Sequence, residues 1–137
     1  MEYKIHDTIN KVDTIDSAAK ALDIQSENII KSLIFLVDDE PYVIIGIGKK
    51  SINLEKIKDL LDADSIEMAS PSVVKKITGY SIGEVPPLSL DFPKIIEKSI
   101  LEKKKVYGGG GSENRILEIE PTYLLDDKTI VSSIQDK

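Results

Sequence analysis

The chain has 137 residues, of which 41% are hydrophobic and 31% are charged, and this balance is typical of one globular domain rather than of a disordered segment. The absence of cysteine excludes disulfides, thiolate catalysis and cysteine-ligated metal sites. A formal net charge of −6 argues against a protein that mainly grips phosphate backbones, because that affinity comes from clustered lysine and arginine. Since no apolar run approaches the roughly 20 residues that span a bilayer, we expect a single cytoplasmic domain over residues 1–137, with no membrane and no DNA as partner.

The first elements predict a helix followed by a hairpin. Residues 14–22 have apolar side chains at helical spacing, and a capping residue stands at the start of this run. After a short turn over residues 26–30, the apolar runs 31–37 and 42–47 flank an acidic turn, which is the pattern of two hairpin strands. A hairpin here favours a mixed sheet over a doubly wound parallel sheet, whose strands need helical crossovers.

The rest of the chain alternates short helices with short strands. Short strands interleaved with short helices indicate a mixed α/β fold, with a mixed sheet or small barrel and helices packed outside it. The expected elements are a helix over 53–61, a strand over 66–69, a helix over 70–78, strands at 95–96, 105–107, 116–119 and 129–131, and a proline-started helix over 120–125.

Two segments rich in glycine or proline are candidates for a site. Gly79–Pro87 has two glycines and two prolines in nine residues, so we expect a loop of constrained backbone. Its part Gly83–Pro87 can present free N–H and C=O groups to a ligand, although a plain turn is the alternative. Gly108–Gly111 follows a predicted strand, and we expect either a loop that brings main-chain amides close to a substrate or a flexible hairpin tip.

Single charged residues supply the remaining candidates. Lys31 begins an apolar strand, where its ammonium either reaches water at an edge or lines a pocket mouth and orients a carbonyl, a ribose hydroxyl or a phosphate. His6 is the only histidine, so a multi-histidine metal site is excluded and a Ser–His–Asp triad would need it as the base. Lysines 49–50 and 103–105 are the candidates for a local RNA contact, with solvated surface as the alternative.

Taken in order, several segments resemble the YbaK/prolyl-tRNA editing family, which also occurs as the editing domain associated with prolyl-tRNA synthetases. The resemblance extends over nearly the whole chain. The matching segments are AAKAL at 18–22, IIKSL at 29–33, LEKIKDLL at 54–61, ASPSVVKKITGY at 69–80, GEVPP at 83–87, VYGGGG at 106–111 and LEIEPTYLL at 117–125.

The resemblance implies a mixed α/β fold around a β-barrel-like sheet, with surrounding helices. It implies hydrolysis of the ester that joins a mischarged amino acid, commonly alanine or cysteine on proline tRNA, to the terminal adenosine. In this family the lysine that matches Lys31 is the main active-site side chain, and no metal or cofactor is expected. The expected substrate-binding residues are Ser32, Ile47, Tyr80, Gly83, Pro86, Pro87, Gly108, Gly109 and Gly110.

Ester hydrolysis suits a chain that is poor in nucleophiles. An aminoacyl ester is already activated and needs only orientation, oxyanion stabilisation and a placed water.

The alternatives to hydrolysis are a non-catalytic module that binds aminoacyl-tRNA or a synthetase, and a small-molecule-binding domain. Gly109 and Ile116 stand where some relatives carry a hydroxyl and an acidic residue, which argues against cysteine specificity. The expected partners are therefore the 3′ end of a mischarged tRNA and an aminoacyl-tRNA synthetase.

Overall fold

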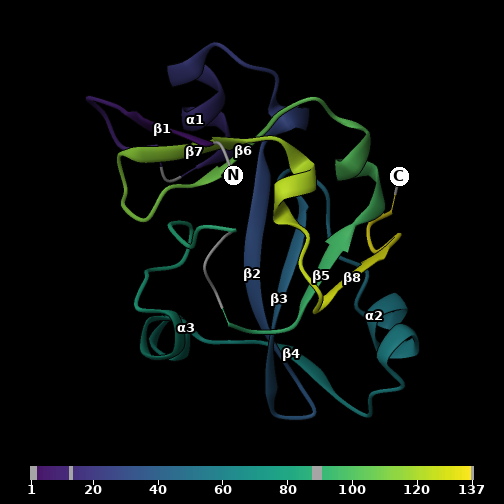
Figure 1. Cartoon of the computed structure of the whole chain (residues 1–137). Helices are drawn as coiled ribbons and strands as arrows, with labels where there is room; N and C mark the ends of the chain where they lie inside the picture. Colours follow the sequence, from purple (N-terminus) through teal and green to yellow (C-terminus); the bar gives the residue numbers. More distant parts are fainter. Residues whose placement is uncertain (1–2, 13, 88–90, 137) are drawn as a thin grey trace.

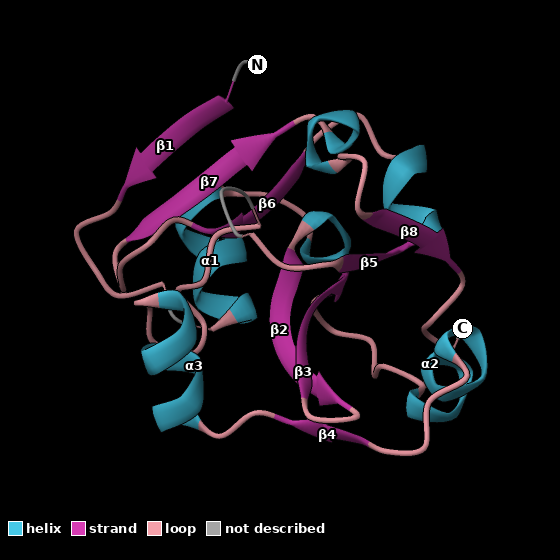
Figure 2. Ribbon diagram, turned by 60° about the horizontal axis from the view of Figure 1, so that its bottom comes forward, coloured by secondary structure: helices cyan, strands magenta, loops and turns pink. Residues whose placement is uncertain are grey.

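The structure is a computed structural model that describes residues 3–12, 14–87 and 91–136, and within these residues the strands form two sheets (Figures 1 and 2). The strands are β1 (Tyr3–Asp7), β2 (Ile30–Val37), β3 (Glu40–Ile47), β4 (Ile66–Met68), β5 (Lys94–Glu97), β6 (Val106–Gly109), β7 (Arg115–Ile119) and β8 (Thr129–Ser132). The α-helices are α1 (Ile15–Leu22), α2 (Leu54–Leu61) and α3 (Pro71–Thr78), and the 3₁₀ turns are η1 (Ser26–Asn28), η2 (Lys98–Glu102) and η3 (Pro121–Leu124).

The larger sheet has the strand order β4-β2-β3-β5-β8, and the smaller sheet has the order β1-β7-β6. The hairpin of β2 and β3 is antiparallel, whereas β5 runs parallel to both β3 and β8. The prediction of a mixed sheet built on this hairpin is therefore confirmed. The hairpin turn places Asp38 and Asp39 at φ values of 48° and 67°, and positive φ at both central residues gives the twist that tight hairpins favour.

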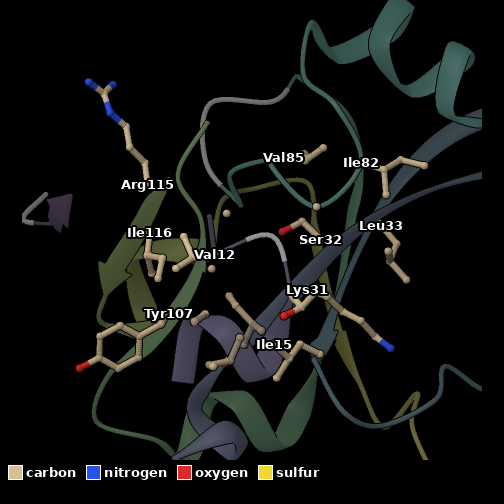
Figure 3. Close-up of a pocket in the computed structure, with 17 residues that line it drawn as sticks. Val12, Ile15, Lys31, Ser32, Leu33, Ile82, Val85, Tyr107, Arg115 and Ile116 are labelled. Carbon is tan, nitrogen blue, oxygen red and sulfur yellow. The ribbon is translucent and has the colours of Figure 1, made fainter. Parts of the chain in front are cut away.

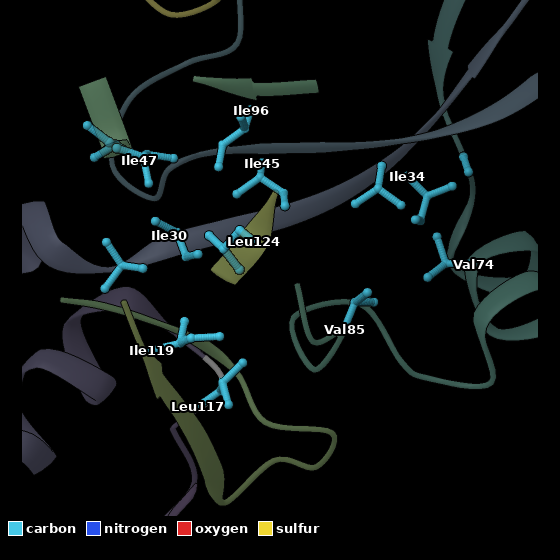
Figure 4. Close-up of a cluster of buried hydrophobic side chains, with 14 residues drawn as sticks. Ile30, Ile34, Ile45, Ile47, Val74, Val85, Ile96, Leu117, Ile119 and Leu124 are labelled. Atoms are coloured by element: carbon cyan, nitrogen blue, oxygen red, sulfur yellow. The ribbon is translucent and has the colours of Figure 1, made fainter. Parts of the chain in front are cut away.

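The main core lies between the two sheets (Figure 4). Val43, Ile45 and Ile47 of β3 face the smaller sheet, whereas Ile44 packs on the opposite face together with Ile57 of α2. Because β3 is buried on both faces, its sequence is a continuous apolar run rather than an alternating one. A third cluster packs α1 against the smaller sheet, and Figure 1 shows that helix beside β7.

Two predictions about the second half of the chain are wrong in detail. The glycine run is not all loop, because Gly108 and Gly109 belong to strand β6. They pair with Leu117 and Ile116 of β7, respectively. The predicted helix over 120–125 is the 3₁₀ turn η3, since its four residues leave no room for a regular α-helix before the chain extends again. No helix in residues 3–12, 14–87 and 91–136 is long and apolar enough to cross a membrane.

Candidate functional site

A pocket of about 190 Å³ lies beside β2, where this strand meets β6 and the loop at residues 82–85 (Figure 3). Most of its lining is apolar and comes from α1 and the segment before it, from β2, and from β6 and β7. The volume is below the ~300–1,000 Å³ of pockets for drug-sized ligands. The pocket can therefore enclose a small group but not a whole nucleotide.

The pocket exists because one edge of β2 is only partly paired. On this edge β4 pairs with Phe35–Val37, and Ile29 makes an isolated bridge to Tyr107 of β6. The N–H of Ala69 donates to the carbonyl of Ile34 at 3.0 Å, which shows that the main-chain groups of Ile34 point to this edge. Because these groups alternate in direction along a strand, those of Ser32 point to the same edge and lie at the pocket floor.

The side chain of Ser32 adds a polar group that lacks a partner. Its Oγ is buried and has no hydrogen-bond partner among the described residues, and Figure 3 shows the hydroxyl pointing into the pocket. Nearly all buried polar atoms in proteins are hydrogen-bonded, because an unpaired one costs about 1–3 kcal/mol. The hydroxyl at the floor of the pocket is therefore available to bond to a polar group of a ligand.

The two segments rich in glycine meet at the wall of this pocket. A Cβ added to Gly109 of β6 would lie 2.6 Å from the carbonyl oxygen of Val85 and 2.9 Å from the carbonyl carbon of Glu84. Only glycine allows two main chains to approach so closely. The N–H of Gly111 also donates to the carbonyl of Glu84 at 3.0 Å. The glycine run thus holds the loop that begins at Gly83, and both segments line the same cavity.

Lys31 lines the pocket as well, but its side chain leaves β2 on the face opposite to that of Ser32, as successive residues of a strand do. Figure 3 shows its ammonium directed away from the Ser32 hydroxyl. The ammonium donates to the carbonyl oxygen of Lys50 at 2.7 Å. Burial lowers the pKa of Lys31 below its ordinary value.

The turn that binds this ammonium, residues 48–50, does not line the pocket itself but is hydrogen-bonded to a residue that does. The N–H of Gly48 donates to the carbonyl of Ile29 at 2.7 Å, and Ile29 is part of the pocket lining. The same turn carries Lys49 and Lys50, both exposed. The ammonium of Lys31 is therefore held at the main chain of this turn rather than at the pocket floor.

The structure brings together part of the predicted site. The predicted residues that line the pocket are Lys31, Ser32, Gly83, Gly108 and Gly109. The predicted residues that do not line it are Ile47, Tyr80, Pro86, Pro87 and Gly110. Ile47 is buried in the core between the sheets, and Tyr80 packs against the same core. Pro87 is fully buried, and Gly110 lies against the main chain of Arg115.

Sequence reasoning missed Arg115 and the segment around α1. Arg115 lines the pocket, donates from Nε to Asp7 at 2.9 Å and extends away from Ser32 in Figure 3. It is the only arginine of the chain and stands four residues after the glycine run. A single arginine so close to a candidate loop could have been recognised from the sequence as a candidate site residue. Ile15 and Ala18 form part of the pocket wall, but their spacing is that of any helix that packs on a core.

His6 is not placed to act as a base for Ser32. Its Nε2 lies 2.9 Å from Oε1 of Glu118, and Lys105 donates to the other oxygen of the same carboxylate at 3.2 Å. Burial alone would raise the pKa of Glu118, but these two hydrogen bonds outweigh it and the pKa is lowered. Among residues 3–12, 14–87 and 91–136, no three histidine, aspartate or glutamate side chains come together as metal ligands would.

Comparison with known proteins identifies relatives over most of the chain. The sequence profile of the family described as "Aminoacyl-tRNA editing domain" matches residues 9–126. A proline–tRNA ligase of Lactobacillus helveticus is 35% identical over 101 residues, which cover 72% of this chain and 18% of that protein. A proline–tRNA ligase of Streptococcus equi is 39% identical over 77 residues, covering 56% and 12%. The chain thus spans less than a fifth of the length of these relatives.

Solved structures agree with this similarity. The crystal structure of hypothetical protein APE2540 superposes with a TM-score of 0.92 at 29% identity and covers 99% of this chain and 93% of that one. The structure of a protein described as a candidate trans-editing enzyme for prolyl tRNA synthetase superposes with a TM-score of 0.89 at 25% identity, covering 98% and 87%.

Proposed function

Because the chain belongs to the aminoacyl-tRNA editing domain family, we propose that it hydrolyses the ester of a mischarged aminoacyl-tRNA, with alanine or cysteine on proline tRNA as the candidate substrates. The observation that carries this proposal is the buried, unpartnered hydroxyl of Ser32 in a small and mostly apolar pocket. Such a pocket suits an amino acid with a small side chain, which is the part of the substrate that an editing enzyme must recognise. The matched proline–tRNA ligases are the reason for choosing proline tRNA and for naming a prolyl-tRNA synthetase as a possible partner protein.

The pocket supplies what ester hydrolysis requires. The Ser32 hydroxyl can bond to the amino group or the carbonyl of the aminoacyl group, and the main-chain amides at the β2 edge and in the loop at Gly83 can polarise the carbonyl. Water adds to that carbonyl, the bond between the carbonyl carbon and the ribose oxygen breaks, and the ribose oxygen takes the proton that the water loses. No protein nucleophile is needed, because the ester is already activated.

Lys31 acts from the rim of the pocket in this proposal. One of the three N–H groups of its ammonium is bound to the Lys50 carbonyl, which leaves two donors for a ribose hydroxyl or a phosphate of the terminal nucleotide. Lys50 on the same turn is exposed and adds positive charge there, whereas the ammonium of Lys49 pairs with the carboxylate of Asp16 at 2.9 Å. This local contact agrees with the net charge of −6, since it needs no extended basic surface.

A deacylation panel tests the proposal. Proline tRNA charged with alanine, cysteine or proline is incubated with the wild type, with Lys31→Ala, and with Lys76→Ala as a control on the exposed surface of α3. We expect release of alanine or cysteine but not of proline, a loss of about a hundredfold or more for Lys31→Ala, and no loss for the control. Folded wild type that binds these tRNAs without hydrolysing any of them would overturn the proposal in favour of a non-catalytic binding module.

A further inference from the structure

The residue opposite Lys31 in the β2–β3 hairpin is Gly46, and another side chain occupies the space above it. Lys31 and Gly46 are register partners, so their side-chain positions share one face of the sheet. A Cβ at Gly46 would lie 2.7 Å from Nε2 of Gln135. Gln135 is only 5% exposed. Because Gly46 has no side chain, the amide group of Gln135 fits on the face of the sheet from which Lys31 projects.

Gln135 uses its whole amide group in hydrogen bonds to the main chain. Its Oε1 accepts from the N–H of Ile47 at 2.7 Å, and its Nε2 donates to the carbonyls of Ile47 and Lys50, both at 2.9 Å. The main-chain N–H of Gln135 itself donates to the buried carboxylate of Glu97 at 2.9 Å. This side chain is therefore fixed at both ends and holds the turn after β3 in place.

The Lys50 carbonyl joins this network to the candidate site. It accepts one hydrogen bond from Gln135 and a second, of 2.7 Å, from the ammonium of Lys31. We infer that Gln135 is a positioning residue for Lys31: it fixes the carbonyl that holds the ammonium at the rim of the pocket. This inference rests on the proposed function for its effect on catalysis, but the contact itself is independent of any activity. A lysine side chain has many rotamers, so a fixed acceptor decides where its charge lies.

A double-mutant cycle tests the catalytic part of the inference. Gln135→Met keeps the length of the side chain but removes its hydrogen bonds, and Gln25→Met is the control at the exposed second glutamine of the chain. We expect kcat/KM for deacylation to fall about tenfold to a hundredfold in Gln135→Met, and the control to match the wild type. In the Lys31→Ala background, Gln135→Met should cause no further loss, because both changes remove the same contribution. A loss of the same size in both backgrounds would assign Gln135 a purely structural role.

A measurement on Lys31 itself separates this inference from the proposed function. In protein labelled with ¹³C at the lysine Cε atoms, with the Lys31 signal assigned from Lys31→Arg, we expect restricted motion of the Lys31 methylene in the wild type and motion like that of exposed lysines in Gln135→Met. If the wild type hydrolyses no substrate but the Lys31 signal responds in this way, the proposed function fails and the positioning role stands. An unchanged Lys31 signal in folded Gln135→Met overturns the positioning role whatever the activity.

Gln135→Asn keeps the test decisive if the methionine variant does not fold. Its amide is one methylene shorter, so it does not reach the main-chain groups of Ile47 and Lys50 that Gln135 binds, and it stays neutral beside the Lys31 ammonium. We expect Lys31 to be mobile in this variant. Lys31 motion that matches the wild type in folded Gln135→Asn would contradict the inference.

Discussion

Gly109→Ala is the substitution with the most direct structural consequence for the pocket. The added methyl group would lie 2.6 Å from the carbonyl oxygen of Val85, 2.9 Å from the carbonyl carbon of Glu84 and 3.0 Å from that of Val85. All three atoms belong to the main chain, so no side chain can rotate out of the way. Restoring an ordinary contact of 3.4 Å from 2.6 Å requires the loop to move by about 0.8 Å, and this loop is one wall of the pocket.

The displacement sets the expected size of the effect. A misplacement of about 1 Å in a catalytic site can cost about a hundredfold in rate, which corresponds to about 2.7 kcal/mol of transition-state stabilisation. Forcing a methyl group into a packed position also costs about 1–3 kcal/mol of folding free energy. We therefore expect Gly109→Ala to fold with a lower melting temperature and to lose most of its deacylation kcat/KM, measured on mischarged proline tRNA below the melting temperature of the variant.

Gly79→Ala is the matched control for this effect. Gly79 ends α3 at a φ of 82°, and no heavy atom lies within 4 Å of the position that its Cβ would take. The alanine there strains the backbone by about 1–2 kcal/mol but displaces no wall of the pocket. We expect lower stability and unchanged kcat/KM. The reasoning is refuted if folded Gly109→Ala retains wild-type kcat/KM, or if Gly79→Ala loses as much activity.

Two further predictions separate binding from stability. Ser32→Ala should leave the stability of the folded state unchanged or increase it, because the deleted hydroxyl has no partner among the described residues. The same substitution should reduce the deacylation rate by about tenfold, because one hydrogen bond to the substrate is lost. Thermal unfolding and deacylation kinetics check the two effects, and a clear loss of stability would contradict the prediction. The lowered pKa of Glu118 means that its carboxylate contributes stability that is fully present above its unfolded pKa of about 4.3 and is lost as the pH falls through the lower folded pKa. Urea unfolding across this acid range should therefore show a smaller loss for Glu118→Gln than for the wild type.

Local signals made much of the fold predictable. The hairpin and the three α-helices are encoded in short windows, where apolar period, capping residues and turn residues occur together. At the start of α1, for example, the hydroxyl of Thr14 accepts a hydrogen bond from the N–H of Ser17, and the hydroxyl of Ser17 accepts one from the N–H of Thr14. The division into two sheets was not predictable in this way, because β1 pairs with β7 over register partners such as Tyr3 and Ile119, which are far apart in the sequence and carry no mark of their pairing.

The site was predictable as a set of segments but not as a geometry. Lys31 and Ser32 are consecutive residues of a predicted strand, so the strand period alone places their side chains on opposite faces, and this consequence could have been drawn from the sequence. Gln135 could not have been found, because a single glutamine near the end of the chain has no pattern that distinguishes a buried side chain from an exposed one. Its role depends on the missing side chain of Gly46, which lies on a different strand.

The partly paired edge of β2 is compatible with the proposed action of an acidic protein on the end of an RNA. A free strand edge exposes N–H and C=O groups that readily pair with other chains, but here β4 and the bridge between Ile29 and Tyr107 cover it on both sides of Ser32. The pocket that remains has a volume of about 190 Å³, which suits a group the size of an aminoacyl ester. In the proposed function, recognition depends on the ester and its small side chain, and the positive charge required is confined to Lys31 at the rim and the turn beside it. A net charge of −6 is compatible with that arrangement, whereas it would oppose binding along the phosphate backbone.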